Sequence, residues 1–486
     1  MALLPAYIAA GTAVVVLLAD LVSGKRGVVV GAGAIGSLAT LGAAILVSSS
    51  RGPFTAFCAS PSACSMVTDD AAAVVAGLFA LLTLGVLALS TPVLRSGDVP
   101  VGEYCFLLAC SMTGGVVLGS ARDLISLIVA LETLTLPLYV LVGLRRSRGA
   151  AGAEAAVTFF VVSVVSTAVA LLGAALLYAA TGAVHFDRIS AALATVVDPH
   201  LRPLVSAGVV LLLAGLSFKV AAVPLHAWAP VTYDGAPLPV AAYLSTASKL
   251  GGVIALIMLT LGGFGPILGT AGPALAVLAV LTMTVGNLIA LRQRRLVRLL
   301  AWSSIAQAGY ILAPLGAYAL HGGRSAAAVP VVLAATVAYT VFYVVLEFGA
   351  FAAVVGLRGD QDGGAIDDYR GAARRSPWLA TALVLALAGL AGLPPGLAGL
   401  FAKVAVVRAL LGGDSVWLAV IVALNAVIGL AYYVRVAATL FGSPSPTSPQ
   451  KVSWAVGTAV GVATLVAVGI GFAPQLVMSL AGAVHP

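Results

Sequence analysis

The chain has 486 residues, of which 61% are hydrophobic and only 9% charged, with a mean hydropathy of +1.12. Soluble globular proteins carry about 25% charged residues, so this composition excludes a soluble protein and indicates one that crosses the membrane many times. The net charge of +8 does not indicate nucleic-acid binding, because most of the cations lie in short segments between apolar runs, where they set membrane orientation.

Apolar runs long enough to cross a bilayer as helices follow one another along the chain. Cations are more frequent after the odd-numbered runs than after the even-numbered ones, and such an excess marks the cytoplasmic side. We therefore predict a multi-pass membrane protein with both termini outside. About fourteen transmembrane helices are predicted, at residues 3–20, 27–48, 72–94, 104–120, 122–143, 155–181, 203–224, 238–262, 268–291, 298–320, 328–357, 377–410, 415–441 and 453–480.

The second run contains VVVGAGAIGS at residues 28–37, which matches the GxGxxG pattern of dinucleotide sites. Such a site needs a strand–turn–helix unit and an acid about 20 residues later. This motif instead lies inside a continuous apolar run, and the next acid is Asp69. Small residues at this spacing let helices pack closely, so we predict a packing motif and no cofactor in this chain.

The four cysteines form no CxxC pair and show no spacing typical of a metal or cluster site. Cys105 and Cys110 lie in an apolar run and are expected to be packing residues. Cys58 and Cys64 share one segment between runs and can form a disulfide if that segment is external.

Ionisable residues within the predicted spans are the main functional signal. Glu132 lies near the middle of the fifth span, Glu347 lies in the eleventh, and three of the five lysines are Lys219, Lys249 and Lys403. An ionisable residue at a helix centre costs about 2.5–3.5 kcal/mol on insertion scales, so such residues usually serve function. A purely structural ion pair is the alternative.

The use of lysine at these positions has a chemical reason. Arginine is the commoner cation of the chain, yet only Arg408 and Arg435 touch apolar runs, near their ends, where long side chains reach the interface. Arginine cannot release its proton inside a protein, whereas a buried lysine can. The lysines therefore indicate a site that gains and loses protons.

Prolines interrupt two spans beside these lysines. Pro224 follows Lys219, and Pro394 and Pro395 precede Lys403. Broken helices are tolerated in a membrane only where protein or water satisfies the freed backbone groups, and one in each half is typical of transporters with inverted repeats. We predict two inverted five-helix repeats with broken helices 7 and 12, and the divisions 1–100 (helices 1–3), 101–262 (repeat one), 263–441 (inverted repeat two) and 442–486 (helix 14).

His226 lies just beyond the first break. It can pass a proton on from Lys219, because histidine titrates near neutral pH. A hydrogen bond to the loop backbone is an equally open interpretation.

Five stretches of the sequence carry a further signal: LETLTLPLYVLVG (131–143), GLSFKVAAVPLHAWAPVTYDGAPLPVAAYLSTASKLGG (215–252), GNLIALRQRRLVRLLAWSSIAQAGY (286–310), LAGLPPGLAGLFAK (390–403) and LNAVIGLAYYVRV (424–436). Together they resemble the antiporter-like membrane subunits of bacterial proton-pumping NADH:quinone oxidoreductase (respiratory complex I), found in the bacterial cell (inner) membrane, and among them subunit N. A subunit M usually has an acid where this chain has Lys403, and a subunit L has a long lateral helix after its last span.

The resemblance implies that Glu132, Lys219, Lys249 and Lys403 form a proton-transfer axis at mid-membrane. This chain departs from the family at Gln307, where a histidine is often found, so proton conduction at this point is expected to use water or Tyr310. Glu347 stands where a small or amide residue is expected, and is interpreted as an added relay site or an ion partner for a neighbouring helix.

The resemblance also implies a function: proton translocation driven by quinone reduction elsewhere in the complex. Quinone, FMN and iron–sulfur clusters are then expected in partner subunits, with subunits of the M and K type as membrane neighbours. The alternatives are a subunit of a multisubunit Na⁺/H⁺ antiporter, a membrane-arm subunit of a related hydrogenase, and a structural subunit whose charges only fix helix packing.

Overall fold

The computed structural model describes residues 1–50, 52–60, 63–195, 199–320, 328–443 and 452–483, and nearly all of them are helical. Twelve helical segments in these ranges are long and apolar enough to cross a membrane. They are α1 (Leu4–Ser23), α2 (Arg26–Ser49), α3 (Asp70–Leu89), α5 (Val101–Ser120), α6 (Leu124–Gly143), α7 (Gly149–Thr181), α11 to α12 (Leu238–Gly263), α13 (Leu268–Ala290), α14 (Leu296–Leu320), α15 (Ala328–Arg358), α19 (Val416–Leu440) and α20 (Trp454–Phe472).

Two shorter apolar helices, α9 (Arg202–Ser217) and α17 (Pro377–Ala391), correspond to the predicted seventh and twelfth spans. Each is followed by a break and then by a second helix, α10 (Trp228–Gly235) or α18 (Leu397–Gly412). The remaining helices are α4 (Thr91–Arg95), α8 (Phe186–Thr195), α16 (Ala372–Arg375) and α21 (Pro474–Ala483), with short 3₁₀ turns at Arg146–Arg148, Pro199–Leu201, Gly265–Ile267 and Ile366–Tyr369. The full count of fourteen crossings and the inverted repeats stay predictions.

Three predicted spans have different ends from the helices observed. The seventh span is predicted at 203–224, but α9 ends at Ser217, seven residues before Pro224. The third and fourteenth each divide into two helices, at Thr91 and at Pro474. Pro92 and Pro474 both lie in the first turn of the second helix, where a missing N–H costs nothing.

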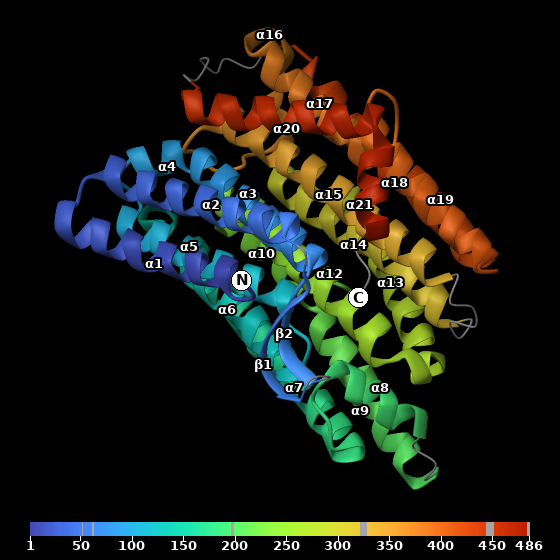
Figure 1. Ribbon diagram of the computed structural model, residues 1–486. Coiled ribbons are helices and arrows are strands. Elements are labelled where there is room, and N and C mark those ends of the chain that lie inside the picture. The colour runs from blue at the N-terminus through green and yellow to red at the C-terminus, as the bar shows by residue number, and fades with distance from the viewer. Residues whose placement is uncertain (51, 61–62, 196–198, 321–327, 444–451, 484–486) are drawn as a thin grey trace.

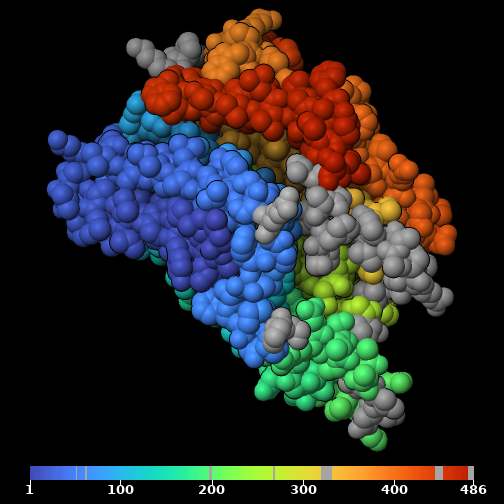
Figure 2. Space-filling view, viewed as in Figure 1, coloured from blue at the N-terminus to red at the C-terminus, as the bar shows by residue number. Residues whose placement is uncertain are grey.

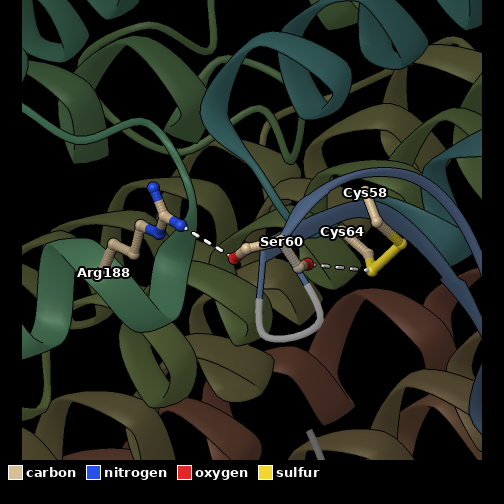
Figure 3. The surroundings of a disulfide bond; sticks show 4 residues. All are labelled: Cys58, Ser60, Cys64 and Arg188. Atoms are coloured by element: carbon tan, nitrogen blue, oxygen red, sulfur yellow. Dashed lines mark hydrogen bonds between the residues drawn. A yellow bond between two sulfur atoms is a disulfide. The ribbon is translucent and has the colours of Figure 1, made fainter.

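The sequence predicted an all-helical chain, but the segment between α2 and α3 forms a hairpin of β1 (Phe54–Ser60) and β2 (Ala63–Thr68). Cys58 and Cys64 lie opposite each other in the antiparallel register and form a disulfide, which confirms that hypothesis (Figure 3). Arg188 on α8 donates to the hydroxyl of Ser60 at 2.9 Å. Cross-strand pairing depends on backbone hydrogen bonds, which hydropathy does not report.

The helices lie side by side, with α1, α2 and α5 at one side of the molecule and α17 to α20 at the other (Figure 1). The long helices α14 and α15 run between these groups, and α13 packs along α14. Figure 2 shows α20 crossing the face of the molecule beside the N-terminal helices, where it packs against α3. The centre of the bundle is therefore enclosed by protein on several sides.

The GxGxxG segment is part of the continuous helix α2, as predicted, and its second and third glycines are packing positions, whereas a Cβ atom at Gly31 would meet nothing within 4 Å. A Cβ atom at Gly36 would lie 2.1 Å from Cγ2 of Thr12 on α1. A Cβ atom at Gly33 would lie 3.3 Å from Leu87 on α3. Only glycine at these positions allows the three helices to approach so closely.

A cluster of ion pairs at one end of the bundle joins three loops. Arg295 donates to Asp234 and to Asp362, both at 2.8 Å, and Arg358 donates to Asp362 at 3.1 Å. Burial alone would raise the pKa of Asp362, but hydrogen bonds and charge from Arg295, with help from Arg148 and Arg358, outweigh burial and hold that pKa below its ordinary value.

This cluster predicts a pH-dependent stability. Asp362→Asn should lower the free energy of unfolding by about 1 kcal/mol at pH 7, the range of partly exposed charge networks. A depressed pKa contributes stability above the unfolded pKa, near 4, and that contribution is lost as the pH falls through the folded value. Thermal unfolding of the detergent-solubilised protein between pH 3 and 7 should therefore show a smaller acid loss in the variant. Equal acid losses would contradict this account.

Candidate functional site

Lys219 and Glu132 form an ion pair in the middle of the bundle. The Lys219 ammonium donates to Glu132 Oε1 at 2.8 Å and to the hydroxyl of Thr135, one turn further along α6, at 2.9 Å. Thr167 on α7 also donates to Glu132 Oε1, at 2.7 Å. The Lys219 side chain is 4% exposed and that of Glu132 is 29% exposed. The pair is therefore buried at its cation and open at its anion.

The break after α9 places Lys219 in this position. Its irregular backbone is satisfied by protein groups: Val223 N donates to the hydroxyl of Thr282, and Trp228 Nε1 donates to the carbonyl of Phe218. Ala221 adopts a positive φ of 57°, which turns the chain. The sequence predicted a break caused by Pro224, whereas the helix already ends at Ser217, so Lys219 itself stands on the irregular segment.

Lys249 is 1% exposed and begins α12 (Lys249–Ile257), directly after a π-helical turn at Leu244–Ser248. Its ammonium donates to the carbonyl and the hydroxyl of Ser304 on α14, at 2.6 and 2.7 Å. π-helical turns within membrane helices often occur at functional sites. Both acceptors of the Lys249 ammonium are neutral oxygens, and no carboxylate in the described part of the chain is hydrogen-bonded to it.

Lys403 lies on α18 and caps the broken end of α17. Its ammonium donates to the carbonyls of Leu390 and Ala391, at 3.1 and 2.5 Å. The last carbonyls of a helix have no intrahelical partner and carry partial negative charge, so a cation is favoured there. Pro394 and Pro395 follow these carbonyls, and the break thus creates the binding site of the lysine.

A chain of hydrogen bonds leads from Lys403 toward α14. Gln307 Nε2 donates to the carbonyl of Leu390, which also accepts from Lys403, and to the hydroxyl of Tyr433, both at 3.0 Å. Tyr433 and Ser303 share a hydrogen bond of 2.5 Å. Sequence reasoning did not single out Tyr433, although it lies in one of the stretches quoted above. Only the packing of α19 against α14 reveals its place.

The suggested relay residues have different surroundings. Tyr310 faces Lys403, with the ammonium 5.5 Å from its ring centre, but its hydroxyl accepts from Asn287. His226 Nδ1 donates to the carbonyl of Pro224 at 3.1 Å, and its ring lies against Trp302. The geometry of His226 matches the loop-backbone interpretation.

Asn287 joins a second polar cluster that the sequence did not indicate. It donates to Asn425 and accepts from the hydroxyl of Tyr432, at 3.2 and 3.0 Å. This cluster lies beside Tyr310, between α13 and α19. Buried amides of this kind hold helices in register, and their partners cannot be read from one sequence.

Arg408 and Arg435 are both exposed at the surface of the bundle. Arg435 donates to the carbonyls of Leu291 and Gln293, at 2.7 and 2.8 Å, and so closes the end of α13. Among the described side chains, no group of three histidines, cysteines or acids is arranged to hold a metal ion.

Comparisons with known proteins show the family of the chain. The sequence profile of the family described as NADH:quinone oxidoreductase/Mrp antiporter, TM, matches residues 121–429. NADH-quinone oxidoreductase subunit N of Salinispora tropica is 60% identical over 99% of this chain and 98% of its own length.

Chains in two solved structures have the same fold as this chain. A chain of respiratory complex I from Thermus thermophilus with bound aureothin is similar with a TM-score of 0.81 and 29% identity, over 98% of this chain and 99% of that one. A chain of the Mrp complex from Dietzia sp. has a TM-score of 0.81 at 20% identity, over 99% and 95% of the two chains. At that identity the second likeness shows the fold alone.

Proposed function

Because this chain belongs to the NADH:quinone oxidoreductase/Mrp antiporter family and to its subunit N members, we propose that it moves protons across the membrane as subunit N of an NADH:quinone oxidoreductase. The observation that carries the proposal is the ion pair of Lys219 with Glu132 beside an interrupted helix. A buried pair gains little stability, because desolvation of both charges offsets their attraction. A role in holding and releasing a proton explains this ion pair better than a contribution to stability does.

The partial exposure of Glu132 supports a protein neighbour. Its side chain is 29% exposed although it lies near the middle of α6, where lipid would otherwise meet a carboxylate. A second membrane subunit on this face would cover it. We propose subunits of the M and K type as the membrane neighbours, with FMN, iron–sulfur clusters and quinone held by other subunits, in a bacterial inner membrane with both termini outside.

The proposed mechanism uses the ion pair as a switch. A rearrangement in the neighbouring subunit draws Glu132 away from Lys219, and the buried ammonium, no longer paired, releases its proton. The proton passes through water to Lys249 and then toward Lys403, and leaves on the outer side. Return of Glu132 favours the charged form of Lys219 again and reloads the site.

Isolation of the chain with an affinity tag from its own membranes tests the assignment. The tagged chain should co-purify with NADH:quinone reductase activity, and vesicles lacking the chain should lose most NADH-driven proton uptake. Co-purification with Na⁺-driven proton exchange and no NADH oxidation would instead identify an antiporter subunit. Co-purification with hydrogenase activity would identify the third alternative.

A further inference from the structure

Glu347 on α15 is a buried acid whose oxygens have no hydrogen-bond partner. Its exposure is 0%, and neither Oε1 nor Oε2 is bonded to any group in the described part of the chain. Burial of an ionised carboxylate without a partner is among the most costly arrangements in a protein. A group kept in such a site is expected to exchange its charge during function.

The surroundings of Glu347 join two parts of the proposed proton path. Its charge interacts with that of Lys249, yet the described atoms of the two side chains form no ion pair within 4 Å. It also interacts electrostatically with Tyr433, which bonds to Gln307. Tyr343, one turn earlier on α15, lies under the Lys249 ammonium, 5.9 Å from ring centre to Nζ. The helix α15, which carries Glu347, packs against α12 and α14, which carry Lys249 and Gln307, and against α18, which carries Lys403.

Among the described residues, the hydrogen-bond partners of Lys249 and Gln307 include no carboxylate, imidazole or amine. On one side, the Lys249 ammonium donates to the hydroxyl and the carbonyl of Ser304. On the other side stands Gln307, whose amide holds Leu390, Tyr433 and Tyr339 but does not take up a proton near neutral pH. A carboxyl group can accept and release a proton at this point, and the unpartnered hydroxyl of Tyr233 adds a second polar group to the site.

We propose that Glu347 carries the proton from Lys249 to the Lys403 half of the chain, an inference that rests on the proposed function. The Lys249 ammonium gives its proton to the Glu347 carboxylate, which leaves a neutral amine and a neutral carboxylic acid. The acid then gives the proton, through water, to the neutral amine of Lys403. Glu347 returns to the carboxylate and Lys403 becomes an ammonium.

The test compares Glu347→Gln with Glu347→Asp in the assembled complex. Glutamine keeps the size of the side chain and cannot carry the proton, whereas aspartate keeps the acid. Protons taken up per NADH oxidised are measured in vesicles at matched complex abundance. We expect the glutamine variant to lose as much uptake as Lys403→Ala and the aspartate variant to keep most of it. Glu103→Gln, the same change at an exposed position on α5, is the matched control.

The other outcomes overturn the proposal. Normal uptake in Glu347→Gln would show that the acid carries no proton. Normal uptake in the glutamine variant together with a loss in the shorter aspartate variant would show that only the size of the side chain matters, and failure of Glu347→Gln to assemble would show a structural role. Lys219→Ala separates these results from the proposed function: it lowers uptake if the chain pumps, whatever Glu347 does, and leaves uptake unchanged if the chain does not pump.

Discussion

Lys219→Ala is expected to abolish or sharply reduce NADH-driven proton uptake while the complex still assembles. The change removes the cation of the central ion pair, which donates to both Glu132 and Thr135. Removing a positioned proton donor typically slows the transfer step on the order of 10²- to 10⁴-fold. Uptake is measured in membrane vesicles with NADH as the electron donor, at complex abundance matched between wild type and variant.

Lys219→Arg separates charge from proton exchange. Arginine keeps the positive charge but cannot release its proton, so this variant should lose proton uptake as well. Glu132→Ala should also lose uptake, because the ammonium then has no partner that can move. Lys25→Ala, the same change at an exposed residue before α2, is the control and should behave as wild type. Unchanged uptake in Lys219→Ala would leave the lysine a structural role only.

Gly399→Ala is expected to prevent stable assembly of the protein. A Cβ atom at Gly399 on α18 would lie 1.6 Å from the carbonyl oxygen of Gly389 on α17, and one at Gly396 would lie 2.1 Å from the Gly389 nitrogen. Both obstacles are backbone atoms, which cannot rotate away, so the two halves of the broken helix would have to separate. We expect a loss on the order of 4 kcal/mol or more, measured as the thermal midpoint and yield of the solubilised complex.

Gly412→Ala is the matched control for this prediction. It lies at the end of the same helix, and a Cβ atom there would meet nothing within 4 Å. This variant should keep wild-type yield. A Gly399→Ala protein with normal stability would mean that α17 and α18 do not cross as closely as described. Because Lys403 binds the carbonyls exposed by this crossing, a partly stable variant should also lose uptake.

The site residues differ in how far the sequence could predict them. Lys219, Lys249, Lys403 and Glu132 were found from the rarity of charge in apolar runs and from the family resemblance. The ion pair of Lys219 with Glu132 followed from the same reasoning and is present at 2.8 Å. Their bonding partners were not predictable, because Ser304 and the carbonyl of Leu390 are ordinary groups that gain a role only through packing.

Composition, local hydropathy and short motifs were enough to predict the membrane class, most of the helices, the family and the four charged positions. Tertiary structure alone decided where α9 ends, which oxygens hold Lys249 and Lys403, and that residues 54–68 form a disulfide-linked hairpin. It also decided that the buried oxygens of Glu347 have no hydrogen-bond partner in the described part of the chain. Each of these depends on backbone geometry and on which groups pack together, whose energies no hydropathy pattern contains.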